Sequence, residues 1–488
     1  MDIDILILGA GVAGLRAAEQ AVKAGVSAAI CSSGGMASPR VIGFNAPVAP
    51  DDSPELFLRD ILDNSAGVGR KDLAETLAYG AASCVRELED EGLVFDRNPD
   101  GGFHLLRPLG CSVPRLVHCG NVTAKRYLDA AVGRLPKVLD FYALDLLMKD
   151  GAVCGAAGIM DGEVVTIRAK AVVLAVGGGG GIFTRTTYPA ECVGSGYAMA
   201  YRAGARLRDM EFVQFEPCRC ARHPIGLSTT LLEKGGKILN SRGERFILPF
   251  APAGEGSLSK AELAQRVARE LRKNEGGVWL DLRDLPKSVI QIDHALYDRR
   301  LRQVGIDLVS EPVEIAPVAH TFLGGVEIEP DGSTSLPGLF AAGEVAGGIH
   351  GANRIGGNAG TEIFLFGAIA GRSAVRYAGT VKTVPDAVFR APFGAGAAAA
   401  EDHRERMARL RAVADDALFV ICSGAGLRRA LAALEAMERE PVRVDTVEAL
   451  RQCYEWKNAL LTTRMVVEAS LRRTGTLGVF CREDDAAE

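Results

Sequence analysis

Short hydrophobic runs that end in glycine predict the strands of a parallel sheet near the start of the chain. The first run covers residues 3–8 and leads into Gly9-Ala10-Gly11-Val12-Ala13-Gly14, after which an alanine-rich stretch with helical spacing reaches Ala24. A second hydrophobic run covers residues 27–31. Together these segments predict a strand, a turn, a helix and a second strand, the unit that binds dinucleotides in α/β proteins.

The later part of the chain repeats the strand signal and then changes character. Hydrophobic runs at residues 171–176 and 339–342 end in Gly177-Gly178 and in Gly343-Glu344. The intervening region is mixed, with a charged helical pattern followed by a strand, at residues 259–273 and 278–282. After the Pro/Gly/Ala stretch 384–400, the spacing predicts three helices at residues 402–414, 426–438 and 447–472.

The glycines of the first turn have separate expected roles. Gly9 permits the tight turn, Gly11 lets the backbone approach a pyrophosphate, and Gly14 lets the helix and strand pack closely, with Ala13 beside them. The phosphate would lie at a helix N-terminus, where free N–H groups and the helix dipole favour negative charge. A glycine-rich turn without a ligand is the alternative, but the position of this turn directly after a strand favours dinucleotide binding.

Composition and charge disfavour several classes of function. The formal net charge is −5 and there is no block of lysine and arginine, which argues against nucleic acid as the main partner. No hydrophobic run reaches the roughly 18 to 20 residues that cross a bilayer, and no basic leader is visible, so we expect a cytoplasmic protein. The 11 cysteines are scattered and never spaced Cys-x-x-Cys, so we expect free thiols and no bound metal or iron–sulfur cluster.

Longer motifs are spread over nearly the whole chain. They lie at residues 110–118 (Gly-Cys-Ser-Val-Pro-Arg-Leu-Val-His), 196–205, 320–325 (His-Thr-Phe-Leu-Gly-Gly) and 343–358 (Gly-Glu-Val-Ala-Gly-Gly-Ile-His-Gly-Ala-Asn-Arg-Ile-Gly-Gly-Asn). Together they resemble the flavoprotein subunits of succinate dehydrogenase and fumarate reductase, and L-aspartate oxidase. The resemblance implies an α/β fold with a Rossmann-like FAD-binding domain (1–217 and 318–380), an inserted α+β capping domain (218–317) and a C-terminal helical domain (381–488).

The resemblance also implies which residues contact FAD. Glu344 would hold the ribose, and the backbone at Asn358, Ala359 and Gly360 would face the edge of the flavin where negative charge develops on reduction. An acidic residue that usually follows the second strand is replaced by Ser32 or Ser33, which disfavours NAD more than FAD. The remaining cofactor contacts expected from the matching segments are Ser112, Gly177, Gly178, Gly343 and Arg354.

Two residues match the carboxylate-binding positions of the family. His320 and Arg354 would bind one carboxylate, because a guanidinium fork fixes its orientation and the imidazole adds a donor. The alternatives are a buried histidine satisfied by the backbone, and an arginine paired with a neighbouring carboxylate. The surrounding motifs favour the functional interpretation.

Other substrate positions of the family have changed. Glu216 replaces a histidine that partners a carboxylate, and its negative charge would repel one. The capping-domain Thr-Glu-Gly falls on Ser228-Thr229-Thr230, so that hydroxyls are kept and the acid is lost. We expect Thr229, Thr230 and Glu216 to contact the substrate.

The catalytic arginine of the family aligns without gaps on Lys260. A lysine ammonium gives up a proton more readily than a guanidinium, but it cannot make a planar two-point contact. A solvated lysine at the start of an amphipathic helix is the structural alternative. Arg222, His223 and Arg266 are further candidates for the proton donor.

These observations predict an FAD-dependent oxidoreductase that transfers a hydride between flavin N5 and a small carboxylate-bearing substrate, other than fumarate or succinate. The FAD is expected to be noncovalent, because no histidine precedes His104 where the family attaches its flavin. One alternative is an electron-transfer subunit that works with an iron–sulfur or other electron-transfer partner protein. Another is a module that binds flavin without turnover.

Overall fold

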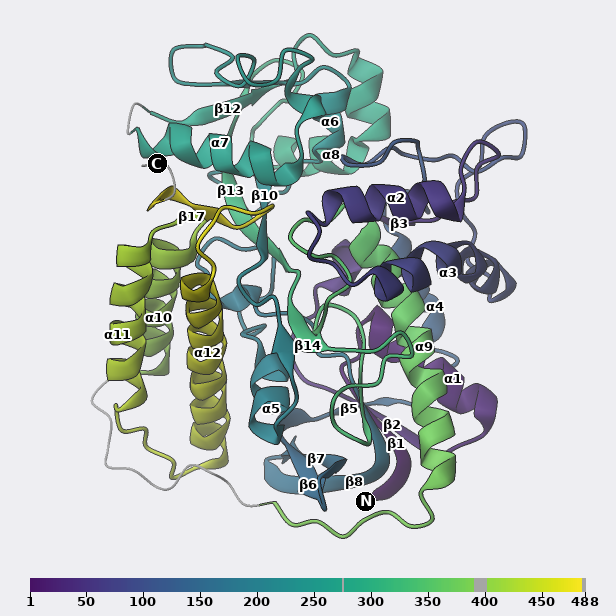
Figure 1. Cartoon of the computed structure of the whole chain (residues 1–488). Coiled ribbons are helices and arrows are strands. Elements are labelled where there is room, and N and C mark those ends of the chain that lie inside the picture. Colours follow the sequence, from purple (N-terminus) through teal and green to yellow (C-terminus); the bar gives the residue numbers. More distant parts are fainter. Residues whose placement is uncertain (274–275, 390–401, 485–488) are drawn as a thin grey trace.

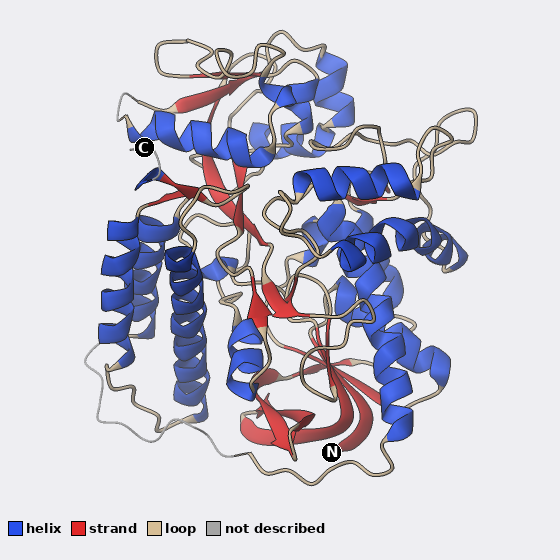
Figure 2. Cartoon of the chain, in the orientation of Figure 1, coloured by secondary structure: helices blue, strands red, loops and turns tan. Residues whose placement is uncertain are grey.

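The computed structural model describes residues 1–273, 276–389 and 402–484. Figure 1 shows three parts, namely a part built on a large sheet at the lower right, a smaller part at the top, and a helical bundle at the left. Figure 2 shows that most of the long strands gather in the first part, whereas the bundle is almost entirely helical. This arrangement confirms the predicted fold class, while the residue limits of the domains stay predictions.

The large sheet is mainly parallel. Its strand order is β5-β2-β1-β8-β7-β6, with β15 paired to β8. The strands β5, β2, β1, β8 and β15 run parallel to one another, whereas β7 pairs antiparallel with both β8 and β6. The bounds are β1 Asp2–Leu8, β2 Ala28–Ser32, β5 Val138–Asp140, β6 Tyr142–Lys149, β7 Ala152–Met160, β8 Glu163–Leu174 and β15 Leu339–Ala341.

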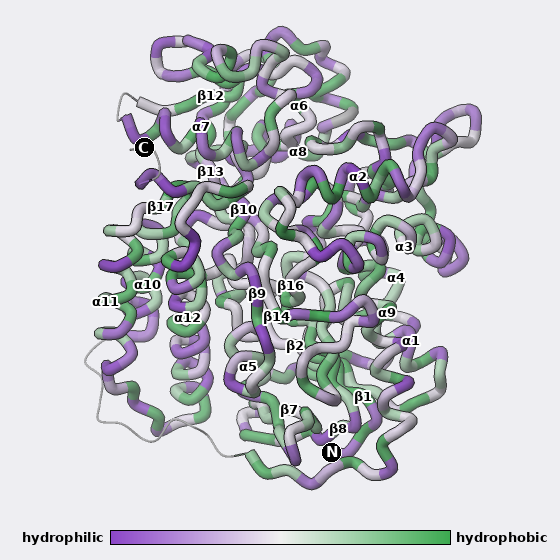
Figure 3. The backbone as a smooth tube through the Cα atoms, viewed as in Figure 1, coloured by the Kyte–Doolittle hydropathy of each residue, from purple (hydrophilic) through white to green (hydrophobic). Residues whose placement is uncertain are grey.

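Two helices pack together against this sheet. Helix α1 (Val12–Ala24) ends at Gly25, which takes the left-handed conformation with φ of 68°. Helix α9 (Asn358–Thr380) packs along it, and a Cβ on Gly367 or Gly371 would lie 2.6 Å from the backbone of α1. The two glycines therefore allow the helix axes to approach closely. In Figure 3 hydrophobic stretches follow the central strands, and the bundle helices alternate between hydrophilic and hydrophobic stretches.

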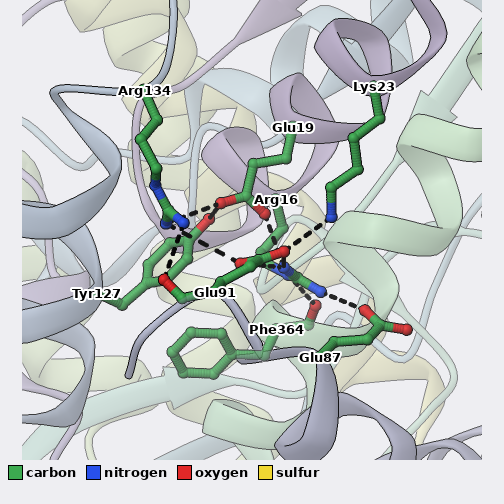
Figure 4. Close-up of polar contacts among 8 residues, drawn as sticks. All are labelled: Arg16, Glu19, Lys23, Glu87, Glu91, Tyr127, Arg134 and Phe364. Atoms are coloured by element: carbon green, nitrogen blue, oxygen red, sulfur yellow. Dashed lines mark hydrogen bonds and ion pairs between the residues drawn. The ribbon is translucent and has the colours of Figure 1, made fainter. Parts of the chain in front are cut away.

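A buried ion cluster joins α1 to its neighbours (Figure 4). Arg16 of α1 is fully buried and lies 2.7 Å from Glu19, 2.6 Å from Glu87 and 3.1 Å from Glu91. Its Nε donates to the carbonyl of Phe364 in α9 at 3.3 Å. The cluster thereby fixes the helix that follows the first glycine turn against α3 (Lys71–Asp90) and α9.

The remaining elements of this part surround the strand ends. They are α2 Pro54–Asn64, α4 Thr123–Ala131, α5 Ser195–Ala203, β3 Gly43–Asn45, β4 Leu116–His118, β9 Leu207–Arg208, β14 Gly325–Glu327, β16 Ala346–Gly347 and the short helices Ser38–Arg40 and Gly180–Ile182.

The upper part has a hydrophobic core of its own, separate from the core that the large sheet shares with the bundle. Its sheet has the order β10-β13-β12-β11, and β10 and β13 continue down toward the large sheet (Figure 1). Its elements are β10 Val213–Cys220, β11 Lys237–Leu239, β12 Val278–Asp281, β13 Val313–Phe322, α6 Thr230–Glu233, α7 Lys260–Arg272, α8 Ala295–Arg302 and the short turns Glu255–Ser257 and Val289–Asp293.

Helix α7 touches both cores. Leu263 and Val267 lie in the core of the upper part, whereas Ala261, Ala264 and Ala268 lie in the main core. The first turn is closed by a capping box, in which the side chains of Ser259 and Glu262 each accept from the backbone N–H of the other. Residue 260, the first of the helix, is therefore held at the junction of the two parts.

The bundle contains the three predicted helices. The observed bounds are α10 His403–Leu418, α11 Gly424–Glu438 and α12 Val447–Arg472, with β17 Ile421–Cys422 and β18 Cys481–Arg482 joining their ends. The predicted stretch 384–400 lies mostly outside the described residues. No helix in the described part of the chain is long and apolar enough to span a membrane. Within the same residues, no group of three or more His, Cys, Asp or Glu side chains is arranged to hold a metal ion.

Candidate active site

Three glycine turns meet at the carboxyl ends of adjacent parallel strands. Leu8 pairs with Leu174, and Leu174 pairs with Ala341, so the turns after β1, β8 and β15 lie side by side. Gly9, Gly177 and Gly343 have φ of 108°, 77° and 73°. Only glycine takes these conformations without strain. The turns form an edge lined by backbone, as binding of a dinucleotide requires.

The first turn has no room for side chains. A Cβ on Gly14 would lie 1.9 Å from the carbonyl oxygen of Gly9, and one on Gly9 would lie 2.2 Å from the carbonyl oxygen of Ala175. Gly11 is the N-cap of α1 and offers no side-chain cap. Ser38 Oγ accepts from the N–H of Val12 at 3.2 Å, a contact that the sequence did not indicate. The tight glycine turn fits the approach of a phosphate to the N-terminus of α1, where Ser38 holds the N–H of Val12.

Glu344 lies at the third turn, where its carboxylate is held by other parts of the site. Oε1 accepts from the backbone N–H of Phe322 at 2.8 Å and from the hydroxyl of Tyr188. Burial raises the pKa of Glu344 to about 7. A Cβ on Gly178 would lie 2.1 Å from the same oxygen, so the second and third turns touch through this side chain. The motif indicated Glu344, but Tyr188 carried no sequence signal.

The start of α9 borders the same site. Its N-cap, Gly357, has φ of 88° and no side-chain cap. The N–H groups of Asn358 and Gly360, two of the three that were predicted to face the flavin, donate to the carbonyls of Ile355 and Gly357 within the turn. Asn45 Nδ2 donates to Asn358 Oδ1 at 2.6 Å, and Asn45 Oδ1 is buried without a partner in the described residues. An unpaired buried amide oxygen next to a helix N-terminus fits a bound polar ligand such as FAD.

His320 is placed by an irregularity in the pairing of β13 with β10. The consecutive residues Gln214 and Phe215 pair with Thr321 and Ala319, so His320 has no residue opposite it. Such a bulge turns a side chain out of the regular alternation of a strand. His320 therefore leaves the sheet face that its sequence position would give it.

The surroundings of His320 favour the neutral form of its imidazole, which is held at one nitrogen. Its surroundings lower its pKa well below the ordinary value, through burial and through the charges of Lys260, Arg354 and Arg40. Thr187 Oγ1 lies 3.1 Å from Nδ1. When this hydroxyl donates to Nδ1, Nε2 carries the hydrogen and can donate to a carboxylate.

Arg354 is buried, with 5% of its surface exposed, and only part of its guanidinium is used. Nη2 donates to Gln214 Oε1 at 2.9 Å, and Nη1 donates to the carbonyl of Ile355 at 3.3 Å. Nε is buried and has no partner in the described residues. A guanidinium stays protonated at biological pH, so Arg354 is a fixed positive charge with a donor to spare.

Lys260 reaches this site from the upper part of the molecule. Its Nζ lies 2.5 Å from Glu216 Oε2, and its Cε lies 3.9 Å from where a Cβ on Gly356 would stand. His320 Nε2 lies 4.0 Å from the same oxygen of Glu216. The structure therefore brings together the three predicted catalytic residues, His320, Arg354 and Lys260, and adds Glu216 to them.

The other candidates for the proton donor have contacts elsewhere. Arg222 pairs with Glu314 at 3.0 Å and is 74% exposed. The guanidinium of Arg266 stacks over the ring of Phe250, at 3.7 Å from its centroid. These contacts favour Lys260 over Arg222 and Arg266.

The remaining predicted residues lie on other segments and contact their own neighbours. Thr229 is buried before α6, and Thr230 Oγ1 contacts Ser228 at 2.7 Å. The N–H and hydroxyl of Ser112 both donate to Asp60. Ser32 ends β2, and the exposed Ser33 follows it.

The glycine edge and the two helix N-termini beside it define the class of this protein as a dinucleotide-binding α/β protein. The chain belongs to the FAD binding domain family, which matches residues 4–359. It is 33% identical to one of the subunits of the fumarate reductase (CoM/CoB) of Methanothermobacter marburgensis, over 99% of this chain and 94% of that one. It is 32% identical to L-aspartate oxidase of Caulobacter vibrioides, over 98% of this chain and 93% of that one.

A solved structure gives the same result. The FrdA chain of Escherichia coli quinol fumarate reductase, in a mutant form, superposes with a TM-score of 0.90 over 99% of this chain and 92% of that chain, at 25% identity. The protein is thus an FAD-dependent oxidoreductase of the fumarate reductase, succinate dehydrogenase and aspartate oxidase type, which acts on CH–CH or CH–NH bonds. The resemblance seen in the motifs is confirmed.

Proposed function

We propose that the protein transfers hydrogen to or from a carbon–carbon or carbon–nitrogen bond next to a carboxylate, in a small acid other than fumarate or succinate. The observation that carries this proposal is the buried guanidinium of Arg354, whose Nε is unpaired in the described residues, beside the neutral imidazole of His320. Both lie near the cofactor edge, since Phe322, two residues after His320, donates to Glu344.

Each group has a distinct expected role. Bound FAD supplies the hydride chemistry, because its N5 gives or takes a hydride at a substrate carbon. Arg354 and the Nε2–H of His320 bind the carboxylate and fix its orientation. The Nζ of Lys260 holds the proton that the adjacent substrate atom gains or loses, and Glu216 keeps Nζ in position. The upper part of the molecule, which corresponds to the predicted capping domain and is called the capping part below, excludes water from the site.

The changed residues support a substrate other than fumarate or succinate. Glu216 introduces a carboxylate where the family resemblance gives a histidine, and Lys260 lacks the planar grip of the arginine that it replaces. We propose that the FAD is held noncovalently, since residues 33–40 offer no histidine for attachment.

A second candidate is a flavoprotein subunit that passes electrons to an iron–sulfur partner. The Methanothermobacter relative, which this chain matches over 99% of its own length, is by its name one subunit of a reductase, and this favours an assembly. Co-purification from the native cell distinguishes the two. A stable brown complex with a small cysteine-rich protein would support the second candidate, and a lone yellow protein would disfavour it.

The experiment that tests the first candidate replaces Arg354 with Ala. Titration of the FAD-loaded protein with α,β-unsaturated acids, followed by the change in flavin absorbance, should show binding weakened by roughly 2 to 4 kcal/mol, because a charged hydrogen-bond partner is lost. Arg429→Ala is the matched control, since Arg429 is 70% exposed in the bundle. Unchanged affinity in Arg354→Ala would show that the carboxylate is bound elsewhere.

A further inference from the structure

The two carboxylate oxygens of Glu216 have different surroundings. Oε2 pairs with Lys260 Nζ at 2.5 Å. Oε1 is buried and has no hydrogen-bond partner in the described residues. Because only 8% of the residue surface is exposed, bulk water does not readily supply one. A buried carboxylate oxygen without a donor is costly, so its presence next to a proposed substrate site indicates that a ligand supplies the donor.

The charges of the site leave room for one substrate carboxylate. The negative charge of Glu216 offsets the positive charge of Lys260. His320 is neutral for the reasons given above. Arg354 then remains as the buried cation whose Nε is an unpaired donor, whereas Arg40, whose charge also reaches His320, is exposed. A dicarboxylate would place its second negative charge beside Glu216, which already occupies the ammonium of Lys260.

The two unpaired atoms, Arg354 Nε and Glu216 Oε1, require opposite hydrogen-bonding groups from a ligand. Nε of Arg354 is a donor and suits a carboxylate, whereas Oε1 of Glu216 is an acceptor and suits an N–H or O–H group. Both residues belong to one cluster, because Gln214 of β10 contacts the guanidinium of Arg354 and Glu216 follows two residues later on the same strand.

We infer that the substrate carries a single carboxylate, bound by Arg354, together with an uncharged or cationic hydrogen-bond donor that Glu216 accepts. This inference rests on the proposed function and narrows its substrate class to monocarboxylates with an amide, amine or hydroxyl group at the other end. Glu216 disfavours dicarboxylates in two ways. Its unpaired oxygen would repel a second carboxylate, and its pairing with Lys260 occupies the ammonium group that could otherwise bind that carboxylate.

A matched pair of ligands tests this directly. Fumarate and its monoamide, fumaramate, have the same size and shape, but the monoamide replaces one carboxylate with a carboxamide donor. Equilibrium titration of the oxidised, FAD-loaded protein, followed by flavin absorbance, should show fumaramate binding at least about tenfold more tightly than fumarate. Equal or tighter binding of fumarate would overturn the inference.

The variant Glu216→Gln sharpens the test. It removes the negative charge and frees Lys260, so the preference for fumaramate should fall about tenfold or more, through tighter binding of fumarate. Glu314→Gln is the control, since Glu314 lies on the neighbouring strand β13 and pairs with the exposed Arg222. An unchanged preference in Glu216→Gln would overturn the inference. If that variant does not fold, the preference measured in the unmodified protein decides alone.

The proposed function can fail separately. Arg354→Ala should lose binding of both ligands. If fumaramate binds equally well to Arg354→Ala and to the unmodified protein, the carboxylate clamp is wrong, whatever the preference between the ligands. If neither ligand binds to the unmodified protein, the inference about the substrate class is overturned, whereas the proposed function is tested by the wider panel of α,β-unsaturated acids.

Discussion

At the scale of single residues, the carboxyl group of Glu344 links the cofactor edge to the substrate site. It accepts from Phe322 and from Tyr188, and Tyr197 donates to the backbone carbonyl of the same residue at 2.9 Å. Burial raises the pKa of this carboxyl from 4.5 to about 7. Below about pH 7 the protonated form is therefore favoured in the folded, cofactor-free protein.

This shift predicts a pH dependence of stability. A group whose pKa is raised by folding contributes stability that is complete below its unfolded pKa and is lost as pH rises through its folded pKa. Between pH 5 and pH 8, the cofactor-free protein should lose roughly 2 kcal/mol of unfolding free energy relative to Glu344→Gln. Urea unfolding at several pH values measures this difference. If the unmodified protein instead became more stable relative to Glu344→Gln as the pH rises, the raised pKa of Glu344 would be contradicted.

The residues that could be predicted from the sequence are those inside recognisable motifs. His320, Arg354, Lys260 and Glu216 were indicated by position, and the structure brings them together. Thr187 could not be predicted as a partner of His320, because its contact depends on a loop passing beside β13. The role of Gln214 likewise depends on a bulge that leaves no mark in the pattern of hydrophobic residues.

At the scale of elements, the glycine turn and α1 form the binding edge for the pyrophosphate. The strand, turn and helix could be predicted, because the glycines follow a hydrophobic run. The observed β1, Asp2–Leu8, agrees with the prediction to within one residue, and α1 ends at Ala24 as predicted but begins at Val12, inside the glycine segment that was predicted to precede it. The bulge in β13 could not be predicted from the sequence, since it arises from pairing with β10, which lies far away along the chain.

The close packing of this turn predicts the effect of one added methyl group. Gly14→Ala should give a protein with little or no bound FAD, because its Cβ would lie 1.9 Å from the carbonyl oxygen of Gly9. Gly379→Ala is the control, since Gly379 lies in α9 with open space around it. The control should keep its flavin and gain up to about 1 kcal/mol of stability. Flavin content is measured by absorbance after purification, and full flavin content in Gly14→Ala would contradict the proposed packing.

At the scale of the whole molecule, the site lies where the parts meet. The capping part contributes Lys260, and the sheet part contributes Arg354. The C-terminal segment joins them, because Gln265 of α7 donates to the carbonyl of Gly478 at 2.9 Å and Val479 donates to Ala352 at 2.8 Å. This meeting could be anticipated only through family resemblance, since no local pattern encodes contacts between distant segments.

The buried cluster around Arg16 stabilises the nucleotide-binding part as a whole. Arg16→Met should lower the free energy of unfolding by roughly 3 to 5 kcal/mol, because the buried Glu19 would keep only Arg134, at 3.6 Å, and the hydroxyl of Tyr127 as partners. Urea unfolding of the cofactor-free protein checks this. Arg439→Met should change stability by less than about 0.5 kcal/mol, since Arg439 is 77% exposed. Equal effects of the two substitutions would show that the cluster adds no net stability.

The central claim is that Arg354 holds the carboxylate of the substrate while Lys260 delivers a proton to the reacting bond. The most direct measurement is the rate at which photoreduced, FAD-loaded protein is reoxidised, without oxygen, by a panel of α,β-unsaturated acids that includes fumaramate. We expect reoxidation in the unmodified protein, loss of binding in Arg354→Ala, and retained binding with turnover slowed about 100-fold or more in Lys260→Met. Reoxidation of Lys260→Met at the unmodified rate, or no reoxidation of the unmodified protein by any acid, would contradict the account.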